Sequence, residues 1–427
     1  MSKKVVLAYS GGLDTSVAIK WIKERYGMEV VTLTVDLGAS RDLSGIKERA
    51  LGLGACKAVV IDAREVFVRY FVLPALQAGA LYEGVYPLAT ALGRPLIAKL
   101  LAEVAEEEGA EAVAHGCTGK GNDQVRFELT LQALAPQLQV IAPVREWDMS
   151  REEAIEYAQT HGIPVEARKQ SPYSIDENVW GRSIECGALE DPWAEPPEDV
   201  WQWTGFVKDC PDEPAIVEIG IEKGVPFRLD KDYMDALHII EKLNKLGGLH
   251  GVGRIDHVES RVVGIKSREV YEAPAAVILH KAHRALEGLV MTREAMRFRD
   301  IVASQYADII YNGQWFSAFH FDLVAYVLSA QRLVTGTVKM QLLKGTATVV
   351  GRRSPLSLYK HELATYEKGD EFDQKAAEGF IKIHGLPLKT QSKAQSQIIY
   401  GTHEIDLACV LPPRLKELTE DKKSCLE

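Results

Sequence analysis

Short apolar runs alternate with helical stretches over residues 1–167 of the chain. The runs are continuously apolar, as in strands that are buried on both faces of a sheet. The stretches between them carry apolar residues at the spacing of a helix face. This alternation predicts an α/β fold, with helices on both faces of a parallel sheet and ligands at the carboxyl ends of its strands. The predicted strands are Val5–Tyr9, Val30–Val35, Ala58–Asp62, Glu111–His115 and Gln139–Ala142.

Helix start and stop signals fall between these strands. A glycine follows each of the first three predicted helices, where a left-handed residue commonly closes a helix. Before the fourth helix, Ser150 and Glu153 have the spacing of a capping box. The predicted helices are Thr15–Tyr26, Ser44–Leu53, Pro95–Glu108 and one from Ser150 to near Gly162.

The pattern changes after this region. The segment Gln170–Pro214 is rich in proline, tryptophan and acidic residues, which predicts an irregular loop at a domain boundary. Later strand and helix signals are mixed, so residues 168–366 are predicted to form a second domain of the α+β class. Residues 367–427 remain as a C-terminal helix and a tail. The elements predicted beyond the loop are a strand at Val217–Glu222, a hairpin over Val338–Val350 across Lys344-Gly345, and helices at Tyr233–Leu246, Pro274–Val290, Arg293–Tyr311 and Gln374–His384.

The segment after the first strand carries the clearest chemical signal. Strand Val5–Tyr9 runs into Ser10-Gly11-Gly12 and then directly into a helix. Glycine lets the backbone approach an anion closely, and the N–H groups and positive dipole of a helix start favour phosphate. The hydroxyls of Ser10, Thr15 and Ser16 can add hydrogen bonds. The alternative is a tight strand-to-helix turn whose polar residues only cap the helix.

This loop is not a Walker A loop, because no Gly-Lys-[Ser/Thr] follows, and it is not Gly-x-Gly-x-x-Gly. Without the lysine that holds the β- and γ-phosphates, attack at the α-phosphate with departure of pyrophosphate fits better. The loop resembles that of the N-type ATP pyrophosphatases, the PP-loop superfamily with the adenine nucleotide alpha hydrolase-like fold. These enzymes adenylate a substrate oxygen and then displace AMP. GMP synthetase, NAD synthetase, asparagine synthetase and argininosuccinate synthase all share the loop, which alone does not choose among them.

A second polar segment, His115–Glu128, follows the fourth predicted strand. Its glycines and its dense set of donors and acceptors suggest a small polar ligand, with an ordinary surface loop as the alternative. Because the carboxyl ends of parallel strands share one edge of the sheet, we expect this segment close to the phosphate loop.

With this segment included, the chain resembles the argininosuccinate synthase family. The resemblance implies that citrulline, aspartate and ATP give argininosuccinate, AMP and pyrophosphate through a citrullyl-adenylate, in arginine biosynthesis. It also implies a PP-loop ATP-binding domain, a synthetase domain, and a homotetramer to which a C-terminal oligomerisation helix contributes. The similar blocks are Ala8–Ser16, Tyr82–Thr90 with Arg94-Pro95, His115–Glu128, Tyr173–Asn178, Gly251–Asp256, Lys266–Glu272, and Ala377–Lys382 with Gly385–Pro387.

The resemblance implies a substrate site as well. No enzyme nucleophile is needed, because ATP activates the ureido oxygen, and Mg²⁺ is expected with the nucleotide. Asp14, Asp123 and Arg126 are the candidates for positioning and charge stabilisation. ATP would contact Ala8, Tyr9, Ser10, Gly11, Gly12, Leu13, Asp14, Thr15, Ser16, Val35 and Gly116. Aspartate would contact Thr118, Asn122 and Asp123, and citrulline would contact Tyr86, Thr90, Asn122, Arg126, Ser174, Ser183, Glu259 and Tyr271.

The residue types suit these roles. Arg126 can pair with a carboxylate through two hydrogen bonds, Glu259 can hold an α-ammonium group, and Asp123 can hold the amine of aspartate. Structural roles are the alternatives: Tyr271 as a packing residue before a helix, and Glu259 as a solvated strand residue. Lys120 can steer anions or simply face water.

Some positions depart from the family pattern. Ala91 replaces a usual serine near the citrulline carboxylate, where Thr90 can supply a hydroxyl instead. Cys117 replaces a usual alanine, and Glu269 replaces a usual glycine in an expected turn before Tyr271. Residues 396–427 extend beyond the customary end of the family and suggest no function.

Composition adds exclusions. The 427-residue chain is 46% hydrophobic and 26% charged, with a formal net charge of −10. No apolar window approaches the ~20 residues of a membrane-spanning helix, no signal-peptide core opens the chain, and the six cysteines show no metal or disulfide spacing. The acidic chain has no basic block, which disfavours nucleic-acid binding. We therefore expect a cytoplasmic protein with small-molecule substrates and no membrane or nucleic-acid partner.

Other functions stay open at this point. A PP-loop ligase that adenylates another amide or ureido oxygen would fit Ala91 and Glu269. A catalytically silent nucleotide-binding protein would have an eroded loop, whereas Ser10, Gly11 and Gly12 are intact. A transfer-RNA thiolation enzyme would need catalytic cysteines and a basic face.

Overall fold

The computed structural model describes residues 3–147, 149–164, 172–367 and 371–399. The contacts within the chain group Met1–Leu358 into one unit and Tyr359–Glu427 into another. The predicted boundary between residues 167 and 168 lies outside the described residues, so the division 1–167, 168–366 and 367–427 remains a prediction.

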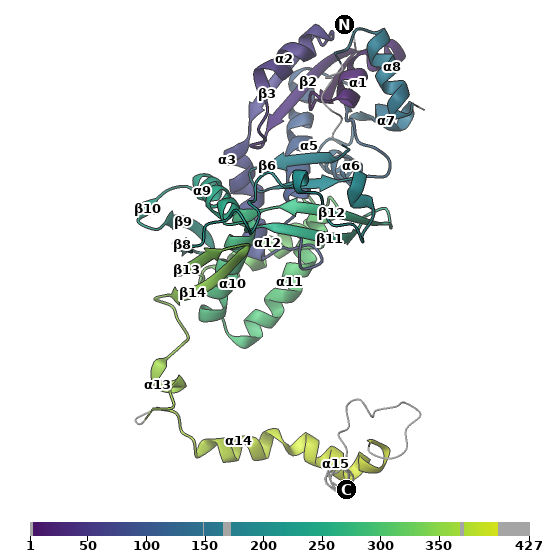
Figure 1. Ribbon diagram of the computed structural model, residues 1–427. Coiled ribbons are helices and arrows are strands. Elements are labelled where there is room, and N and C mark those ends of the chain that lie inside the picture. Colours follow the sequence, from purple (N-terminus) through teal and green to yellow (C-terminus); the bar gives the residue numbers. More distant parts are fainter. Residues whose placement is uncertain (1–2, 148, 165–171, 368–370, 400–427) are drawn as a thin grey trace, which may run out of the picture. The chain divides into compact units, whose positions relative to one another are not determined.

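The five strands predicted for the N-terminal region are present and form one parallel sheet in the order β3-β2-β1-β4-β5 (Figure 1). The central strand β1 pairs with β2 on one side and β4 on the other, with Val6 opposite Val31 and Val113. The chain adds β2 and β3 on one side of β1 and then crosses over to add β4 and β5 on the other side. Ligands of open α/β sheets bind at such a switch point. The strands are β1 (Lys4–Ala8), β2 (Glu29–Asp36), β3 (Lys57–Asp62), β4 (Ala112–Ala114) and β5 (Gln139–Ile141).

Alternate residues of β1 are buried in opposite helical layers. Leu7 packs in a cluster with Val17 of α1, whereas Val6 packs with Leu101 of α5 and Phe127 of α6. Burial on both faces explains why the strand is continuously apolar. The helices are α1 (Leu13–Tyr26), α2 (Leu43–Gly52), α3 (Arg64–Phe67), α4 (Leu73–Ala78), α5 (Ala89–Glu107), α6 (Asp123–Leu134), α7 (Pro143–Glu146) and α8 (Arg151–Thr160), with a π-helical turn at Val68–Val72.

The predicted capping box of α8 is confirmed, but the predicted start of α5 is wrong. Ser150 and Glu153 exchange both hydrogen bonds of the box. Proline commonly opens a helix, yet α5 begins at Ala89 and contains Pro95 in its interior. Burial of Ala91 and Leu92 extends the helix in the N-terminal direction. The first turns of α5 therefore contribute to the site described below.

The polar segment His115–Glu128 is only partly a loop. It follows β4 next to β1, as expected, but α6 already begins at Asp123. Phe127 and Leu131 pack against the sheet, and their burial explains the helix. Asp123 and Arg126 are therefore held on the first turn of α6.

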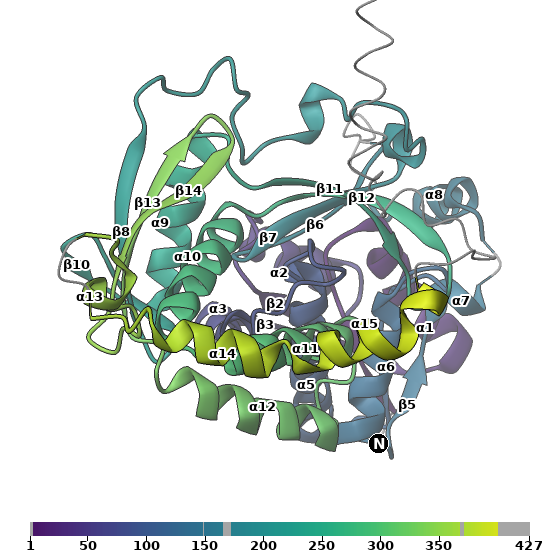
Figure 2. The same cartoon turned by 90° about the horizontal axis from the view of Figure 1, so that it is seen from below.

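Within the described residues, two antiparallel sheets and four further helices follow in the rest of the first unit. Their strand orders are β10-β9-β8-β13-β14 and β11-β12-β7-β6, and α10 packs against β13 and β14 (Figure 2). The predicted strand and hairpin are confirmed as β8, β13 and β14. The strands are β6 (Ser174–Asn178), β7 (Gly181–Glu185), β8 (Ala215–Glu222), β9 (Val225–Leu229), β10 (Asp232–Tyr233), β11 (Arg254–Ser260), β12 (Lys266–Glu272), β13 (Gly336–Leu343) and β14 (Thr346–Arg353).

The prediction of an irregular loop over Gln170–Pro214 is wrong for its first part. There β6 and β7 form an antiparallel hairpin, and β7 also pairs with β12. The strand β6 is polar because it lines a cavity, so it lacks the apolar alternation that reveals a strand. Beyond it, the loop contains only the short 3₁₀ turns Gly187–Glu190 and Glu198–Val200.

The helices of this region follow the prediction with one shift and one addition. The predictions Pro274–Val290 and Arg293–Tyr311 are confirmed as α10 and α11. Helix α9 spans Ala236–Leu249 rather than starting at Tyr233, because Asp235 caps it by accepting a hydrogen bond from the backbone N–H of His238 at 2.9 Å. Helix α12 (Ala318–Gln331) was not predicted, because its apolar residues do not form a single stripe.

The second unit contains α13 (His361–Ala364), α14 (Ala376–His384) and α15 (Leu386–Ile399). Helix α14 confirms the final predicted helix, and α15 follows it after Gly385. Of the tail from residue 396, only residues 396–399 lie within the described part. Among all described helices, none has the length and apolar character needed to cross a membrane.

Candidate functional site

The phosphate loop leaves the start of α1 open to an anion. Gly11 has a φ of 79°, a left-handed conformation that glycine adopts without strain. Gly12 is the N-cap residue of α1 and has no side chain to bond the first turn, so backbone N–H groups there can face a phosphate. The loop is held by a contact of its own, with Ser10 Oγ 3.1 Å from Thr15 Oγ1, and by α2, from which Arg49 Nη1 donates to the Gly11 oxygen at 2.9 Å.

The loop after β4 lies against the phosphate loop. A Cβ atom at Gly116 would lie 2.9 Å from Thr15 Cγ2, so a side chain there would force the two loops apart. Residues of both loops and of the β6–β7 hairpin line one cavity of about 470 Å³. This volume is in the range of small-molecule sites.

Most residues predicted to contact substrates line this cavity. They are Ala8, Tyr9, Ser10, Asp14, Thr15, Val35, Tyr86, Thr90, Gly116, Thr118, Asn122, Asp123, Arg126, Ser174, Ser183 and Glu259. The predicted residues outside the lining are Gly11, Gly12, Leu13, Ser16 and Tyr271. Ser16 is buried and its Oγ lies 3.1 Å from the hydroxyl of Tyr9.

One face of the sheet β11-β12-β7-β6 forms a wall of the cavity. Tyr271 on β12 is opposite Ser183 on β7, which is opposite Asp176 on β6. Residues two apart on a strand share a face, so Glu269 lies on the same face as Tyr271, and the register of β11 adds Glu259. Glu269 therefore lies within a strand and not in the expected turn. Side chains alternate between the two faces of each strand, and the pairing of the strands then brings polar groups that are far apart in the sequence onto one face.

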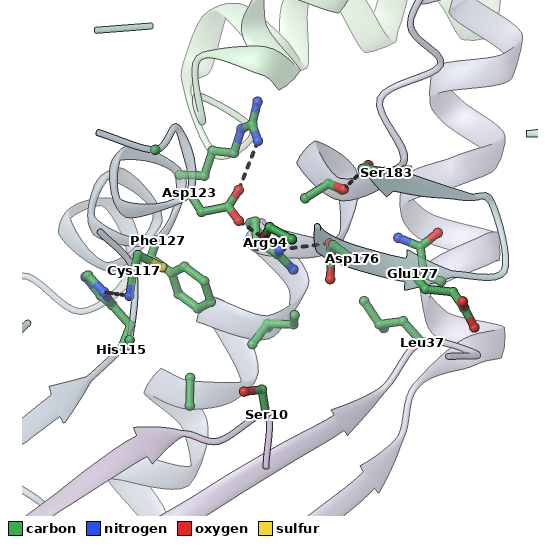
Figure 3. A pocket seen from close by; sticks show the side chains of 18 of the residues that line it. Ser10, Leu37, Arg94, His115, Cys117, Asp123, Phe127, Asp176, Glu177 and Ser183 are labelled. Atoms are coloured by element: carbon green, nitrogen blue, oxygen red, sulfur yellow. Dashed lines mark hydrogen bonds and ion pairs between the residues drawn. The ribbon is translucent and has the colours of Figure 1, made fainter. Parts of the chain in front are cut away.

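Asp123 is paired with two arginines, of which Figure 3 labels Arg94. Its carboxylate oxygens lie 3.0 Å from Arg126 Nη1 and 2.8 Å from Arg94 Nη2, and that same Arg94 nitrogen lies 2.8 Å from Asp176 Oδ2. Burial acts to raise the pKa of Asp123, but the two guanidinium groups lower it below its usual value. Asp123 is therefore a carboxylate near neutral pH.

Tyr311, the last residue of α11, connects three predicted site residues. Its hydroxyl accepts a hydrogen bond from Asn122 Nδ2 at 2.8 Å and donates one to Glu259, and its carbonyl oxygen accepts one from Arg126 Nε at 3.0 Å. Its ring stacks on Tyr82 with 3.5 Å between centroids. Arg126 is only 3% exposed, and its Nη2 has no hydrogen-bond partner among the described residues. A buried donor thus remains for a ligand in the cavity.

Glu259 is buried, with 1% of its surface exposed, so it is not a solvated strand residue. Tyr271, buried behind it, donates a hydrogen bond to Glu259 Oε2 at 2.5 Å and stacks on Tyr86 with 4.2 Å between centroids. Nearby, Thr90 Oγ1 lies 2.7 Å from Ser183 Oγ. This side of the cavity offers a fixed carboxylate and several hydroxyls.

Sequence reasoning gave no role to several residues of the site. Arg94, Asp176 and Glu269 belong to blocks that resemble the family, and only the fold shows that they line the cavity. Tyr311 had no signal at all, because a tyrosine at the end of an amphipathic helix reads as a core residue. Its contact with Asn122 joins positions 189 residues apart.

Two residues of the polar loop have clear environments. Cys117 lines the cavity, and burial raises the pKa of its thiol to about 12, so the thiol stays protonated near neutral pH. A protonated thiol is a poor nucleophile, which disfavours thiolation chemistry at this site. Lys120 is exposed and does not line the cavity.

Comparison with known proteins gives the same family for both regions of the chain. A model of the "Arginosuccinate synthase N-terminal HUP domain" matches residues 4–164, and one of the "Arginosuccinate synthase C-terminal domain" matches residues 173–391. An argininosuccinate synthase from Dehalococcoides mccartyi is 56% identical over 395 residues, which is 92% of this chain and 97% of that protein. The enzymes of Symbiobacterium thermophilum and Geobacillus kaustophilus are 58% and 57% identical over 394 residues, 92% of this chain and 98% and 97% of theirs.

Proposed function

Since this chain belongs to the argininosuccinate synthase family, we propose that it joins citrulline to aspartate in arginine biosynthesis, converting ATP to AMP and pyrophosphate. The ureido oxygen of citrulline attacks the α-phosphorus of ATP, and pyrophosphate leaves. The amine of aspartate then attacks the ureido carbon of the citrullyl-adenylate and loses a proton, and AMP leaves with the ureido oxygen.

One observation carries this proposal: an open phosphate loop and a set of paired charges line the same cavity. The loop after β1 brings backbone N–H groups at the start of α1 to the cavity for phosphates, while Arg126 and Glu259 offer a cation and an anion for an amino acid. Burial keeps the thiol of Cys117 in this cavity protonated, which supports activation by ATP rather than by a cysteine nucleophile. Positioning and charge stabilisation then supply the rate enhancement.

For aspartate, we assign Thr118, Asn122 and Asp123. Without substrate, Asp123 is paired with Arg94 and Arg126. A carboxylate of the substrate can compete for these guanidinium groups, which frees Asp123 to accept a hydrogen bond from the substrate amine.

For citrulline, the unpartnered Nη2 of Arg126 is the donor for the α-carboxylate, and Glu259 is the acceptor for the α-ammonium group. Tyr86, Thr90, Ser174 and Ser183 line the cavity and can orient the chain and the ureido group. Tyr271 does not line the cavity, and its hydroxyl positions Glu259 by donating a hydrogen bond to the carboxylate.

We propose that Mg²⁺ enters with ATP. Mg²⁺ is commonly held by substrate phosphates and one or two carboxylates, and Asp14 and Asp36 line the cavity beside the phosphate loop. Among the described residues, no group of three or more His, Cys, Asp or Glu side chains that could hold a metal ion is present. The ion would neutralise phosphate charge.

A cytoplasmic location of the protein remains a prediction.

The function is tested by product analysis. Purified protein with ATP, citrulline and aspartate is expected to release AMP and pyrophosphate in equal amounts and to form argininosuccinate. Release of ADP and phosphate, or turnover that does not depend on citrulline, would contradict the proposal. Omitting aspartate provides the control for the second step.

Tyr311→Phe tests the network that joins Asn122, Glu259 and Arg126. The hydroxyl is lost while the ring and the backbone contact stay, so the KM for citrulline is expected to rise by about tenfold, the effect of losing roughly one well-placed hydrogen bond to a charged group. Tyr306→Phe is the matched control, because its hydroxyl, buried on the same helix, has no partner among the described residues. Equal effects of both substitutions on KM would show that Tyr311 only packs.

We also propose that the chain forms a homotetramer through its C-terminal helix. Phe380, Ile381 and Ile383 on α14 are 65%, 67% and 72% exposed, and an apolar surface of this kind favours a protein contact. Light scattering is expected to give four times the chain mass of 47.3 kDa, and Phe380→Glu with Ile383→Glu a smaller particle. A monomer at micromolar concentration would refute the assembly.

A further inference from the structure

The part of the cavity around Glu259 holds more carboxyl groups than the proposed contacts with citrulline use. Glu269 on β12 lines the cavity beside Glu259. Its Oε2 lies 3.0 Å from the hydroxyl of Tyr271, the same hydroxyl that donates to Glu259. Its Oε1 lies 3.3 Å from Arg261 Nη2, which is also paired with Glu185. Only 14% of the Glu269 side chain is exposed.

We propose that Glu269 is a substrate-binding residue that, together with Glu259, receives the α-ammonium group of citrulline and sets the preference for an α-amino acid. This proposal rests on the proposed function, since it assigns a further contact to the same substrate.

The geometry supports a cation at this position. Glu269 and Glu259 share one face of the sheet and one hydroxyl donor, and Arg261 is the cation paired with Glu269 and Glu185. Glu259 is buried, Glu269 is largely buried and Glu185 is partly exposed. Arg261 pairs with the last two, so the carboxylate of Glu259 and the remaining oxygens can accept hydrogen bonds from an ammonium group. In the same cavity, the buried Nη2 of Arg126 has no hydrogen-bond partner among the described residues and can donate to an anion. The two poles match a zwitterionic amino acid.

The surroundings of Glu269 also predict a pH dependence. Burial, reinforced by Glu259 and Glu185, raises the pKa of Glu269 to about 8, against the opposing effects of Arg261 and Tyr271. Tyr86 is the other titratable group whose pKa responds to Glu269. Below that pKa the carboxyl is largely protonated before citrulline binds. An ammonium group stabilises the ionised form, so binding releases a proton and becomes tighter as the pH rises toward 8, and then levels off.

The test compares wild type with the isosteric Glu269→Gln. At saturating ATP and aspartate, the KM of wild type for citrulline is expected to fall by about three- to tenfold between pH 6.5 and 8.5, because each pH unit below the pKa costs up to tenfold in affinity. The KM of Glu269→Gln for citrulline should change by less than about twofold over this pH range. At pH 8.5 it should be about tenfold higher than that of wild type. Glu269→Asp keeps a carboxyl group and should retain a pH dependence.

The deaminated analogue 5-ureidopentanoate separates recognition from packing. Its inhibition constant is expected to be nearly the same in wild type and Glu269→Gln, whereas the KM for citrulline rises. Glu294→Gln, a control at an exposed site, should change neither the inhibition constant of the analogue nor the KM for citrulline. Equal weakening of citrulline and the analogue, or an unchanged pH profile, would overturn the inference. If wild type releases no AMP with citrulline, the proposed function itself fails, which is a distinct result.

Discussion

Replacing Arg126 with glutamine is expected to lower kcat/KM for citrulline by about 100- to 1,000-fold. Arg126 is buried and contacts Asp123 and the carbonyl oxygen of Tyr311, with its Nη2 left for the substrate. Asp123 keeps Arg94 as its partner, so the loss falls on the substrate carboxylate, which loses its buried donor. Truncating one partner of a buried, hydrogen-bonded charge pair costs roughly 2–5 kcal/mol of binding free energy. Steady-state release of AMP measures the effect.

Two further variants separate the causes. Arg126→Lys keeps the charge, but an ammonium group lacks the planar set of N–H donors that lets a guanidinium group bond several acceptors at once. An intermediate loss of kcat/KM is therefore expected. Arg284→Gln removes a comparable Arg–Asp pair, with Asp300, that is exposed at the surface and far less costly to break. If Arg126→Gln retains more than about a third of the wild-type kcat/KM, Arg126 does not contact substrate in the transition state.

Replacing Glu272 with alanine is expected to lower the melting temperature by roughly 5–10 °C, from a loss of about 3–5 kcal/mol in the free energy of unfolding. Glu272 is fully buried at the end of β12 and accepts hydrogen bonds from Arg182 at 2.8 Å and from the backbone N–H groups of Gln202, Trp203 and Thr204. Its loss leaves the buried guanidinium group of Arg182 with the more distant Glu177, at 3.7 Å, as its ion-pair partner, and leaves unsatisfied donors in the segment that follows Val200.

Thermal unfolding followed by circular dichroism gives the measurement. Glu103→Ala is the matched control, because Glu103 pairs with Lys99 on the surface of α5 and contributes at most about 1 kcal/mol. Glu272→Asp should recover part of the stability. A melting temperature for Glu272→Ala within about 2 °C of wild type would show that water satisfies these groups instead.

The N-terminal region was predictable because its signals are local. A continuously apolar strand followed by Ser10-Gly11-Gly12 and a helix fixes the phosphate loop without reference to the rest of the chain. The ends of the predicted strands and helices there shifted by a few residues, except at Pro95, whereas α3, α4, α6 and α7 were not predicted. At Pro95, burial of the preceding turn outweighed the usual preference of proline for a helix start.

The cavity wall was not predictable because its signals are tertiary. The strand β6 is polar on the side that a core strand would make apolar, and its pairing with β7 is what defines it. Tyr311, Arg94 and Glu269 acquire roles only when α11, α5 and β12 meet around Asp123 and Glu259. Single-sequence patterns report the elements, but not which polar side chains from distant elements contact one another.

The central claim, adenylation of the ureido oxygen at the α-phosphate, is tested most directly by oxygen transfer. Citrulline labelled with ¹⁸O at the ureido group is incubated with enzyme, ATP and aspartate, and the products are analysed by mass spectrometry. We predict that AMP carries one ¹⁸O atom and that pyrophosphate and argininosuccinate carry none. Unlabelled AMP, or label in phosphate with formation of ADP, would contradict the account.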